Sequence, residues 1–350
     1  MKRKGVSYDA GRVMGINWRP NFDPKVVHRE LEIIKNDLHC NAVRICGLNI
    51  DRLMIAVEDA LKQGLEVWLS PELWEKSQEK TLKYVTKAAT AAESLRQQWP
   101  DQLVFSVGSE FTLFMHGIIE GRRLMDRLRN PKNWVRVKAG EHNKPLNEFL
   151  TRVNDAVRKE FHGKLTYASL IWEAVDWKLF DFVGVDHYRA ARIEDKYVEM
   201  LKPLFTYGKP VVITEFGYGT FQSDKGMAET LIGGGGVDYM RLFLHTIPFF
   251  GRFVRPQMKG THIRDEGWQA RQLVDQLSVL DSAGVDGAFV FQFVSQISPY
   301  SDNPKYDLDM ASFSLVKSYT DGKHGTTYPD MTWEPKESFK AVANYYAKSA

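Results

Sequence analysis

Eight short runs rich in Val, Ile, Leu and Phe recur along the 350-residue chain, and amphipathic stretches separate most of them. The apolar runs cover residues 4–9, 41–46, 65–70, 103–110, 165–172, 181–188, 209–218 and 286–294. The helical stretches cover residues 24–38, 50–64, 78–99, 146–161, 197–205, 268–284 and 335–348. Strands that alternate with helices form right-handed βαβ units and a parallel sheet. Eight such units in a chain of this length predict a closed (β/α)8 TIM barrel that occupies residues 1–350 as a single domain.

Two connections, residues 118–145 and 219–267, are longer than ordinary loops and follow the fourth and seventh strands. Because the loops after the strands of such a barrel line its active face, we expect both segments to form walls of a substrate cleft. The alternative is a peripheral insertion that serves stability or oligomer contacts. The glycine run at 233–236 is interpreted as a flexible lid or turn.

Charge and motif content exclude several other classes of protein. The net charge is only +3, and basic and acidic residues are interspersed, which predicts neither a nucleic acid nor a membrane partner. No apolar signal segment follows the basic start of the chain, so a cytoplasmic protein is expected. The nine histidines form neither an H-x-H pair on an early strand nor an H-E-x-x-H motif, so no metal or other cofactor is expected. Cys40 and Cys46 are interpreted as free buried thiols, with a disulfide as the alternative.

The fourth and seventh strands each end in a glutamate. Glu110 closes the run "LVFSVGSE" and Glu215 lies within "VVITEFGYG". Two carboxylates that face each other across a barrel mouth, about 5 to 5.5 Å apart, are what a retaining glycoside hydrolase requires. One attacks the anomeric carbon, and the other protonates the leaving oxygen and later deprotonates water. The alternative for either glutamate is a structural ion pair with an arginine.

With these two glutamates the chain resembles the glycoside hydrolases of clan A, which are (β/α)8 enzymes, although no family within the clan is singled out. The resemblance implies that Glu110 is the acid/base and Glu215 the nucleophile. It also implies that Arg44, in "NAVRICG", keeps the nucleophile ionised, and that Tyr188, in "VGVDHYR", donates a hydrogen bond to it. His187 precedes this tyrosine and is expected to help position the glutamates; a half-buried packing role is the alternative for Tyr188.

The chain departs from the clan pattern at two positions. Ser109 stands immediately before the acid/base glutamate, where many members of the clan carry an asparagine whose amide contacts the sugar 2-hydroxyl. Gln292 and Phe293 stand where the eighth strand often ends in a tryptophan. Trp172 is the preferred candidate for an aromatic platform beneath the sugar, with ordinary packing as the alternative.

The sequence therefore predicts a retaining β-glycoside hydrolase whose partner is an oligosaccharide or glycoside. The sugar, the linkage and the oligomeric state are left open. Two alternatives remain: a carbohydrate-binding protein without activity on a hydrolase-like barrel, and a transglycosylase that forms the same covalent intermediate.

Overall fold

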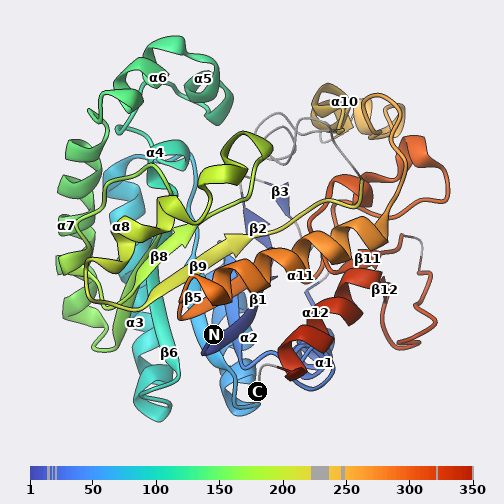
Figure 1. Ribbon diagram of the computed structural model, residues 1–350, viewed down its shortest axis with the longest axis horizontal. Coiled ribbons are helices and arrows are strands. Elements are labelled where there is room, and N and C mark those ends of the chain that lie inside the picture. Colours follow the sequence, from blue (N-terminus) through green and yellow to red (C-terminus); the bar gives the residue numbers. More distant parts are fainter. Residues whose placement is uncertain are drawn as a thin grey trace.

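A computed structural model describes residues 1–13, 16–17, 19, 22–221, 236–245, 249–320 and 322–348. Its centre is a closed barrel of eight parallel strands, hydrogen-bonded in the order β1-β10-β9-β8-β7-β6-β5-β4 (Figure 1). The strands are β1 (Arg3–Asp9), β4 (Ala42–Gly47), β5 (Glu66–Pro71), β6 (Leu103–Ser109), β7 (Lys164–Leu170), β8 (Val183–Asp186), β9 (Val211–Phe216) and β10 (Gly287–Val290). The predicted (β/α)8 barrel is confirmed.

The strands of the barrel are buried on both faces. Every residue of β1, β4 and β6 is buried, as expected for parallel strands covered by helices. A compact cluster of Ala42, Trp68, Val104, Phe182, Val212 and Phe289 forms one part of this core. The larger hydrophobic cluster joins strand residues such as Val43 and Ile45 to helix residues such as Leu53.

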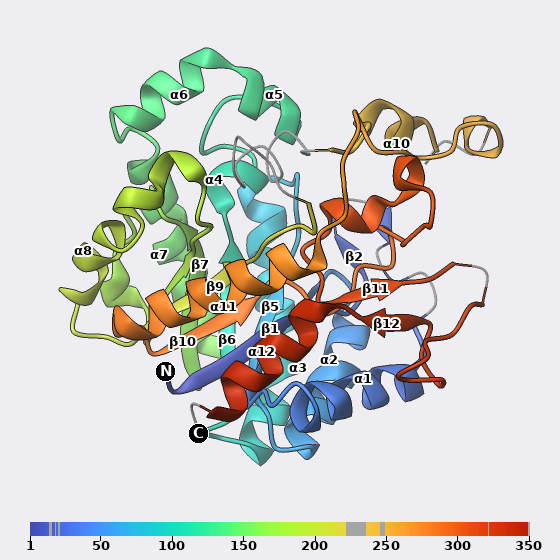
Figure 2. The ribbon, with the colours of Figure 1, turned by 45° about the vertical axis from the view of Figure 1, so that its right-hand side comes forward.

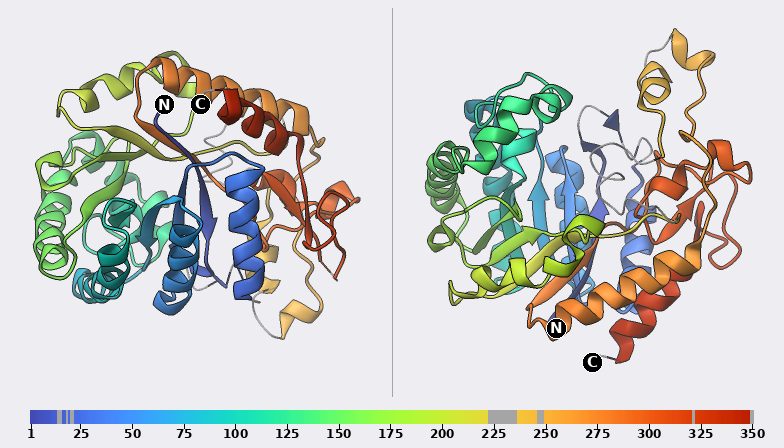
Figure 3. Two further views of the ribbon diagram at one scale, coloured as in Figure 1. Left: turned by 90° about the horizontal axis from the view of Figure 1, so that it is seen from below. Right: turned by 45° about the horizontal axis from the view of Figure 1, so that its top comes forward.

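Helices surround the barrel, as the view from below makes clear (Figure 3). They include α1 (Pro24–Asn36), α2 (Ile50–Lys62), α3 (Gln78–Gln98), α7 (Asn143–Glu160), α11 (Glu266–Ser282) and α12 (Glu337–Lys348). Asp23, Asn49, Ser77 and Asp265 cap the first turns of α1, α2, α3 and α11 by accepting backbone N–H groups. Local sequence signals thus fix where these helices begin.

Two predicted elements are shorter than expected. Instead of a helix over 197–205, the chain forms the 3-10 turn η3 (Glu199–Leu201) followed by the one-turn helix α8 (Lys202–Phe205). Pro203 explains this, because proline lacks the N–H that a helix interior needs and is tolerated only in a first turn. The eighth strand spans only Gly287–Val290, and the chain then passes through a cis peptide between Phe291 and Gln292.

The segments after β6 and β9 carry elements of their own. Residues after β6 form α4 (Phe111–Phe114), α5 (Leu124–Arg129) and α6 (Pro131–Lys138) before α7 begins. The described part of the segment after β9 contains α10 (Tyr239–His245) and the turn η4 (Phe250–Arg252). The glycine run lies outside the described residues apart from Gly236.

The remaining strands form two small hairpins outside the barrel. They pair β2 (Arg12–Val13) with β3 (Ile16–Asn17), and β11 (Val316–Ser318) with β12 (Trp333–Pro335), which leads into α12 (Figure 2). Cys40 and Cys46 are buried and free, as expected. In the described part of the chain, no helix is both long and apolar enough to cross a bilayer.

Candidate active site

Glu110 and Glu215 both lie at the carboxyl end of the barrel, and a register shift precedes each of them. Between Ser106 and Ser109, β6 advances three residues while its partner β7 advances two. Strand β9 likewise gains one residue on β8 just before Glu215. Such bulges bend a strand and redirect its side chains, and they are frequent beside active sites.

The backbone of Glu110 is held in an unusual conformation. Its φ and ψ are both 45°, in the left-handed region that a non-glycine residue seldom adopts. Its N–H donates to the carbonyl of Ala168, and its carbonyl accepts the N–H groups of Leu113 and Phe114 at the start of α4. Preceding it, Gly108 leaves space for the ring of Phe111, which an added Cβ would approach to 2.1 Å. Several contacts therefore fix the direction of the Glu110 side chain.

Arg44, from β4, is the cationic partner of Glu215. Its Nη1 donates to Oε1 of Glu215 at 2.6 Å, and its Nη2 donates to Ser70 Oγ at 3.1 Å and to Glu72 Oε1 at 3.2 Å. The guanidinium is nearly inaccessible to solvent, with 1% of its side chain exposed. Because an arginine does not lose its proton in a protein, it supplies a permanent positive charge beside the Glu215 carboxylate.

Tyr188, just beyond β8, donates its hydroxyl to the other oxygen of Glu215. The distance from Tyr188 Oη to Glu215 Oε2 is 2.9 Å. The ring of Tyr188 also packs against Phe313, with centroids 5.8 Å apart. Each carboxylate oxygen of Glu215 thus accepts a hydrogen bond from a buried or packed donor, and the two bonds together orient the carboxylate.

Glu110 lies in the opposite electrostatic environment. Burial raises the pKa of its carboxyl well above the usual range, and the negative charges of Asp186, Glu215 and Glu173 raise it further. Within the described residues its side chain accepts no hydrogen bond that would favour ionisation. Burial and these neighbouring charges, including that of Glu215, therefore both favour the protonated form of Glu110.

A third carboxylate, Asp186 at the end of β8, connects the two strands that carry the glutamates. Its Oδ2 accepts from Ser109 Oγ at 3.2 Å, and its Oδ1 accepts from Thr214 Oγ1 at 2.6 Å. Ser109 of β6 is thus hydrogen-bonded to β8, two strands away in the barrel. The sequence did not predict a role for Thr214. It shows only that a polar residue stands at the end of an apolar strand at this position.

The other expected site residues make different contacts. His187 is completely buried, stacks on Tyr197 with centroids 4.0 Å apart, and its Nε2 lies 2.9 Å from the Tyr197 carbonyl oxygen. Burial lowers its pKa to about 4, so the ring is neutral. Its backbone N–H donates to the carbonyl of Glu215, and this is its link to the glutamates.

Trp172 and Gln292 lie at the ends of β7 and β10. Trp172 is half-buried and meets Trp134 and His142 edge to face, with centroids 6.2 and 5.1 Å away. Gln292 is 4% exposed, and its carbonyl accepts the N–H of Leu315. Neither side chain contacts Glu110 or Glu215 among the interactions of the described residues.

Further buried acids surround the mouth. Burial raises the pKa of Glu72 to about 8, that of Glu173 to about 7 and that of Asp9 to about 7. Glu173 accepts the N–H groups of Thr112 and Leu170 and the hydroxyl of Tyr167. These acids hold protons near neutrality, which limits the negative charge that accumulates in the mouth.

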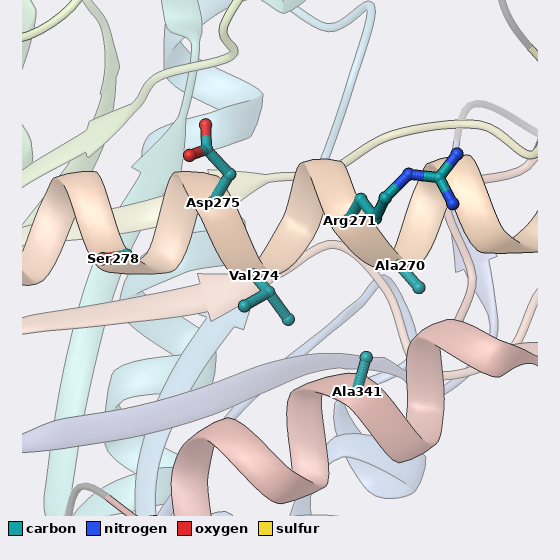
Figure 4. A pocket seen from close by; sticks show the side chains of 6 residues that line it. All are labelled: Ala270, Arg271, Val274, Asp275, Ser278 and Ala341. Atoms are coloured by element: carbon teal, nitrogen blue, oxygen red, sulfur yellow. The ribbon is translucent and has the colours of Figure 1, made fainter.

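The described residues contain no group of three or more His, Cys, Asp or Glu side chains arranged to hold a metal ion. A surface groove of about 510 Å³ lies between α11 and α12, lined by Ala270, Arg271, Val274, Asp275, Ser278 and Ala341 (Figure 4). The groove lies on the outer helical layer, and neither Glu110 nor Glu215 lines it.

The closed barrel has the fold of known (β/α)8 glycosidases, so the predicted resemblance is confirmed at the level of the fold. A GH113 β-1,4-mannanase superposes with a TM-score of 0.59 at 13% identity, over 99% of this chain and 98% of that one. The GH113 β-mannanase of Alicyclobacillus acidocaldarius, in complex with ManMIm, gives 0.57 at 14% identity, over 99% and 98%.

A Bacteroides uniformis β-glucuronidase, covalently bound to cyclophellitol-6-carboxylate aziridine, gives a TM-score of 0.58 at 14% identity. That match covers all of this chain but 36% of the longer enzyme. No family model matches the sequence, and no curated protein matches it either.

Proposed function

We propose that this protein is a retaining β-glycoside hydrolase in which Glu215 is the nucleophile and Glu110 is the general acid/base. The observation that supports the proposal is that the two carboxyl groups lie in different hydrogen-bonding and electrostatic environments. Glu215 accepts hydrogen bonds from Arg44 at 2.6 Å and Tyr188 at 2.9 Å, while burial and neighbouring charges raise the pKa of Glu110. Retaining hydrolysis needs one ionised carboxylate and one protonated carboxyl group.

The mechanism follows from these two states. Glu215 attacks the anomeric carbon while Glu110 gives its proton to the glycosidic oxygen, so the leaving group departs as a neutral alcohol. The covalent glycosyl ester neutralises Glu215, and Glu110, now ionised, takes a proton from water as that water attacks the ester. Hydrolysis restores both carboxyl groups to their starting states. A sugar hydroxyl in place of water would give transglycosylation.

Supporting roles are proposed for the remaining residues. Arg44 and Tyr188 stabilise the charge that returns to Glu215 when the ester breaks. Ser109 positions Asp186, and the backbone of His187 fixes Glu215, whereas Trp172 and Gln292 are proposed as more distant parts of the substrate-binding mouth. An oligosaccharide or glycoside is the proposed partner, and no cofactor takes part.

The decisive test is turnover of a panel of aryl β-glycosides that includes mannoside, glucoside, galactoside and glucuronide. Glu215→Gln should abolish release of the aryl group from whichever glycoside the unmodified protein cleaves. Glu148→Gln on α7 is the matched control, since Glu148 is exposed and makes no ion pair with a described residue.

The panel also separates the proposal from its main competitor. If the unmodified protein binds sugars but cleaves no glycoside, a binding protein on a hydrolase-like barrel is the better description. If Glu215→Gln retains full activity, the assignment of the nucleophile is wrong.

A further inference from the structure

The residues after β6 and β9 form two arms at the mouth of the barrel. The first arm is residues 118–145, with α5 and α6, and the second arm is residues 236–245 and 249–264, with α10 and η4. Both follow the carboxyl ends of strands that lead to the glutamates, so both lie on the rim of the active site. In Figures 1 and 2 they rise on opposite sides of this rim.

Positive charge is concentrated on these arms. The first arm contains eight basic and three acidic residues, and the second contains five basic and one acidic residue, a combined charge of +9. Because the whole chain carries +3, all other residues together carry −6. Charges that look interspersed along the sequence are therefore unevenly distributed over the molecule.

Most of these cations are not neutralised by neighbours. On the first arm Arg122, Arg123, Arg129, Lys132 and Lys138 are exposed, and on the second arm Arg252, Arg255 and Lys259 are exposed. None of them forms an ion pair with a described residue. Arg136, by contrast, pairs with Glu120 and Glu141 and adds little free charge.

The second arm also exposes apolar side chains next to its cations. Phe249 is 71% exposed and Phe253 is 77% exposed, and their rings meet edge to face with centroids 6.2 Å apart. Flat aromatic surfaces of this kind stack against the apolar faces of sugar rings. Cations beside aromatic rings suit a sugar chain that also carries negative groups.

We propose that the two arms bind an anionic glycan, a sugar chain with carboxylate, sulfate or phosphate groups, on either side of the bond that is cleaved. This inference rests on the proposed function, because it treats the mouth as the site of glycoside cleavage. The cations of the arms attract the charged units that lie outside the reacting position.

An anionic membrane surface is the competing occupant, and the geometry disfavours it. The cations and exposed rings lie on two arms that stand on opposite sides of the mouth. A flat bilayer that contacted both arms would cover the mouth and separate the glutamates from dissolved substrate. A flexible glycan, in contrast, contacts both arms while it passes through the site between them.

Affinity electrophoresis with the full chain tests the inference without requiring turnover. Polygalacturonate is the anionic probe, unmodified dextran the neutral probe, and phosphatidylglycerol vesicles and double-stranded DNA the competing polyanions. We expect polygalacturonate, but not dextran, to retard the protein, with retardation that weakens as salt is raised. A variant that carries Arg122→Gln, Arg129→Gln, Arg252→Gln and Lys259→Gln should bind polygalacturonate at least about tenfold more weakly.

The matched control replaces four exposed lysines on α3, α7 and α12, away from the arms: Lys87→Gln, Lys159→Gln, Lys340→Gln and Lys348→Gln. It removes the same charge and should change binding by less than about twofold. Equal loss in both variants, absence of polygalacturonate binding, or tighter binding of vesicles or DNA than of polygalacturonate would each overturn the inference.

The two proposals fail separately. Turnover of aryl glycosides by the unmodified protein tests the hydrolase proposal, whereas binding of polygalacturonate tests the arms. Cleavage of aryl glycosides without polygalacturonate binding would remove the anionic-glycan inference and leave the hydrolase intact. Arm-dependent polygalacturonate binding without any glycosidase activity would leave a binding protein for anionic glycans.

Discussion

Tyr188→Phe isolates a single hydrogen bond to the proposed nucleophile. The substitution keeps the ring that packs against Phe313 and removes only the hydroxyl that donates to Glu215 Oε2 at 2.9 Å. Arg44 still donates to the other oxygen at 2.6 Å, so the carboxylate keeps its charge partner. A hydrogen bond to a charged group contributes about 1.5–3 kcal/mol, which corresponds to roughly 10- to 150-fold in rate.

The step that this bond should affect is hydrolysis of the covalent intermediate. In the glycosyl ester Glu215 is neutral, and negative charge returns to its oxygens in the transition state for ester cleavage, where the Tyr188 hydroxyl would stabilise it. We therefore expect deglycosylation to slow by roughly 10- to 150-fold, with kcat and KM falling together as the intermediate accumulates.

Stopped-flow kinetics with a dinitrophenyl glycoside that the protein cleaves measures this effect. Tyr188→Phe should show a burst of about one dinitrophenolate per enzyme molecule, followed by slow turnover. Tyr197→Phe is the matched control, because its buried hydroxyl donates to the carbonyl of His187 at 3.0 Å and contacts neither glutamate. A folded Tyr188→Phe enzyme with unchanged kcat and no burst would refute the reasoning.

Three further measurements test the remaining assignments. Glu110→Gln should slow glycosides with poor leaving groups by at least about 100-fold while sparing dinitrophenyl glycosides, and equal losses would contradict an acid role. Glu215→Ala should lose nearly all turnover and regain it with azide as a glycosyl azide, whereas full activity without azide would exclude Glu215 as nucleophile. Burial raises the pKa of Glu72 to about 8 and that of Glu173 to about 7, above the ordinary value of 4.5, so their stabilising contribution is complete below about pH 4.5 and is lost as pH rises through 7 to 8. The free energy of unfolding measured with urea should accordingly fall by at least about 2 kcal/mol between pH 5 and pH 8, and a flat profile would contradict these protonation states.

The barrel was predictable because its signals are local. Each strand is a short run of apolar residues, and caps such as Asn49 and Ser77 mark helix starts within a few residues. The error at 197–205 also has a local cause, since apolar periodicity suggested a helix that Pro203 interrupts. Topology then brought the ends of β6 and β9 to the same rim, as the predicted fold required.

The contacts around Asp186 were not predictable in this way. Its hydrogen bonds to Ser109 and Thr214 depend on the register of β6, β8 and β9, and two of these strands gain a residue just before the glutamates. A bulge changes which face a side chain occupies, and apolar periodicity in one sequence does not reveal it. The direction of His187 toward Tyr197 is equally a result of packing between distant segments.

The proposed roles of Glu110 as acid/base and Glu215 as nucleophile depend on the surroundings of each side chain rather than on residue type. Both are glutamates after apolar strands, and the sequence alone assigns their roles only through resemblance. Arg44 and Tyr188 are bound to one of them, and mutual repulsion with Glu215 and Asp186 helps to keep a proton on the other. Because buried like charges resist ionising together, stabilising Glu215 as a carboxylate itself favours protonated Glu110. In the proposed mechanism, Arg44 and Tyr188 distinguish Glu215 as the nucleophile, whereas burial and the neighbouring carboxylates favour the protonated form of Glu110 despite the opposing charge of Arg44.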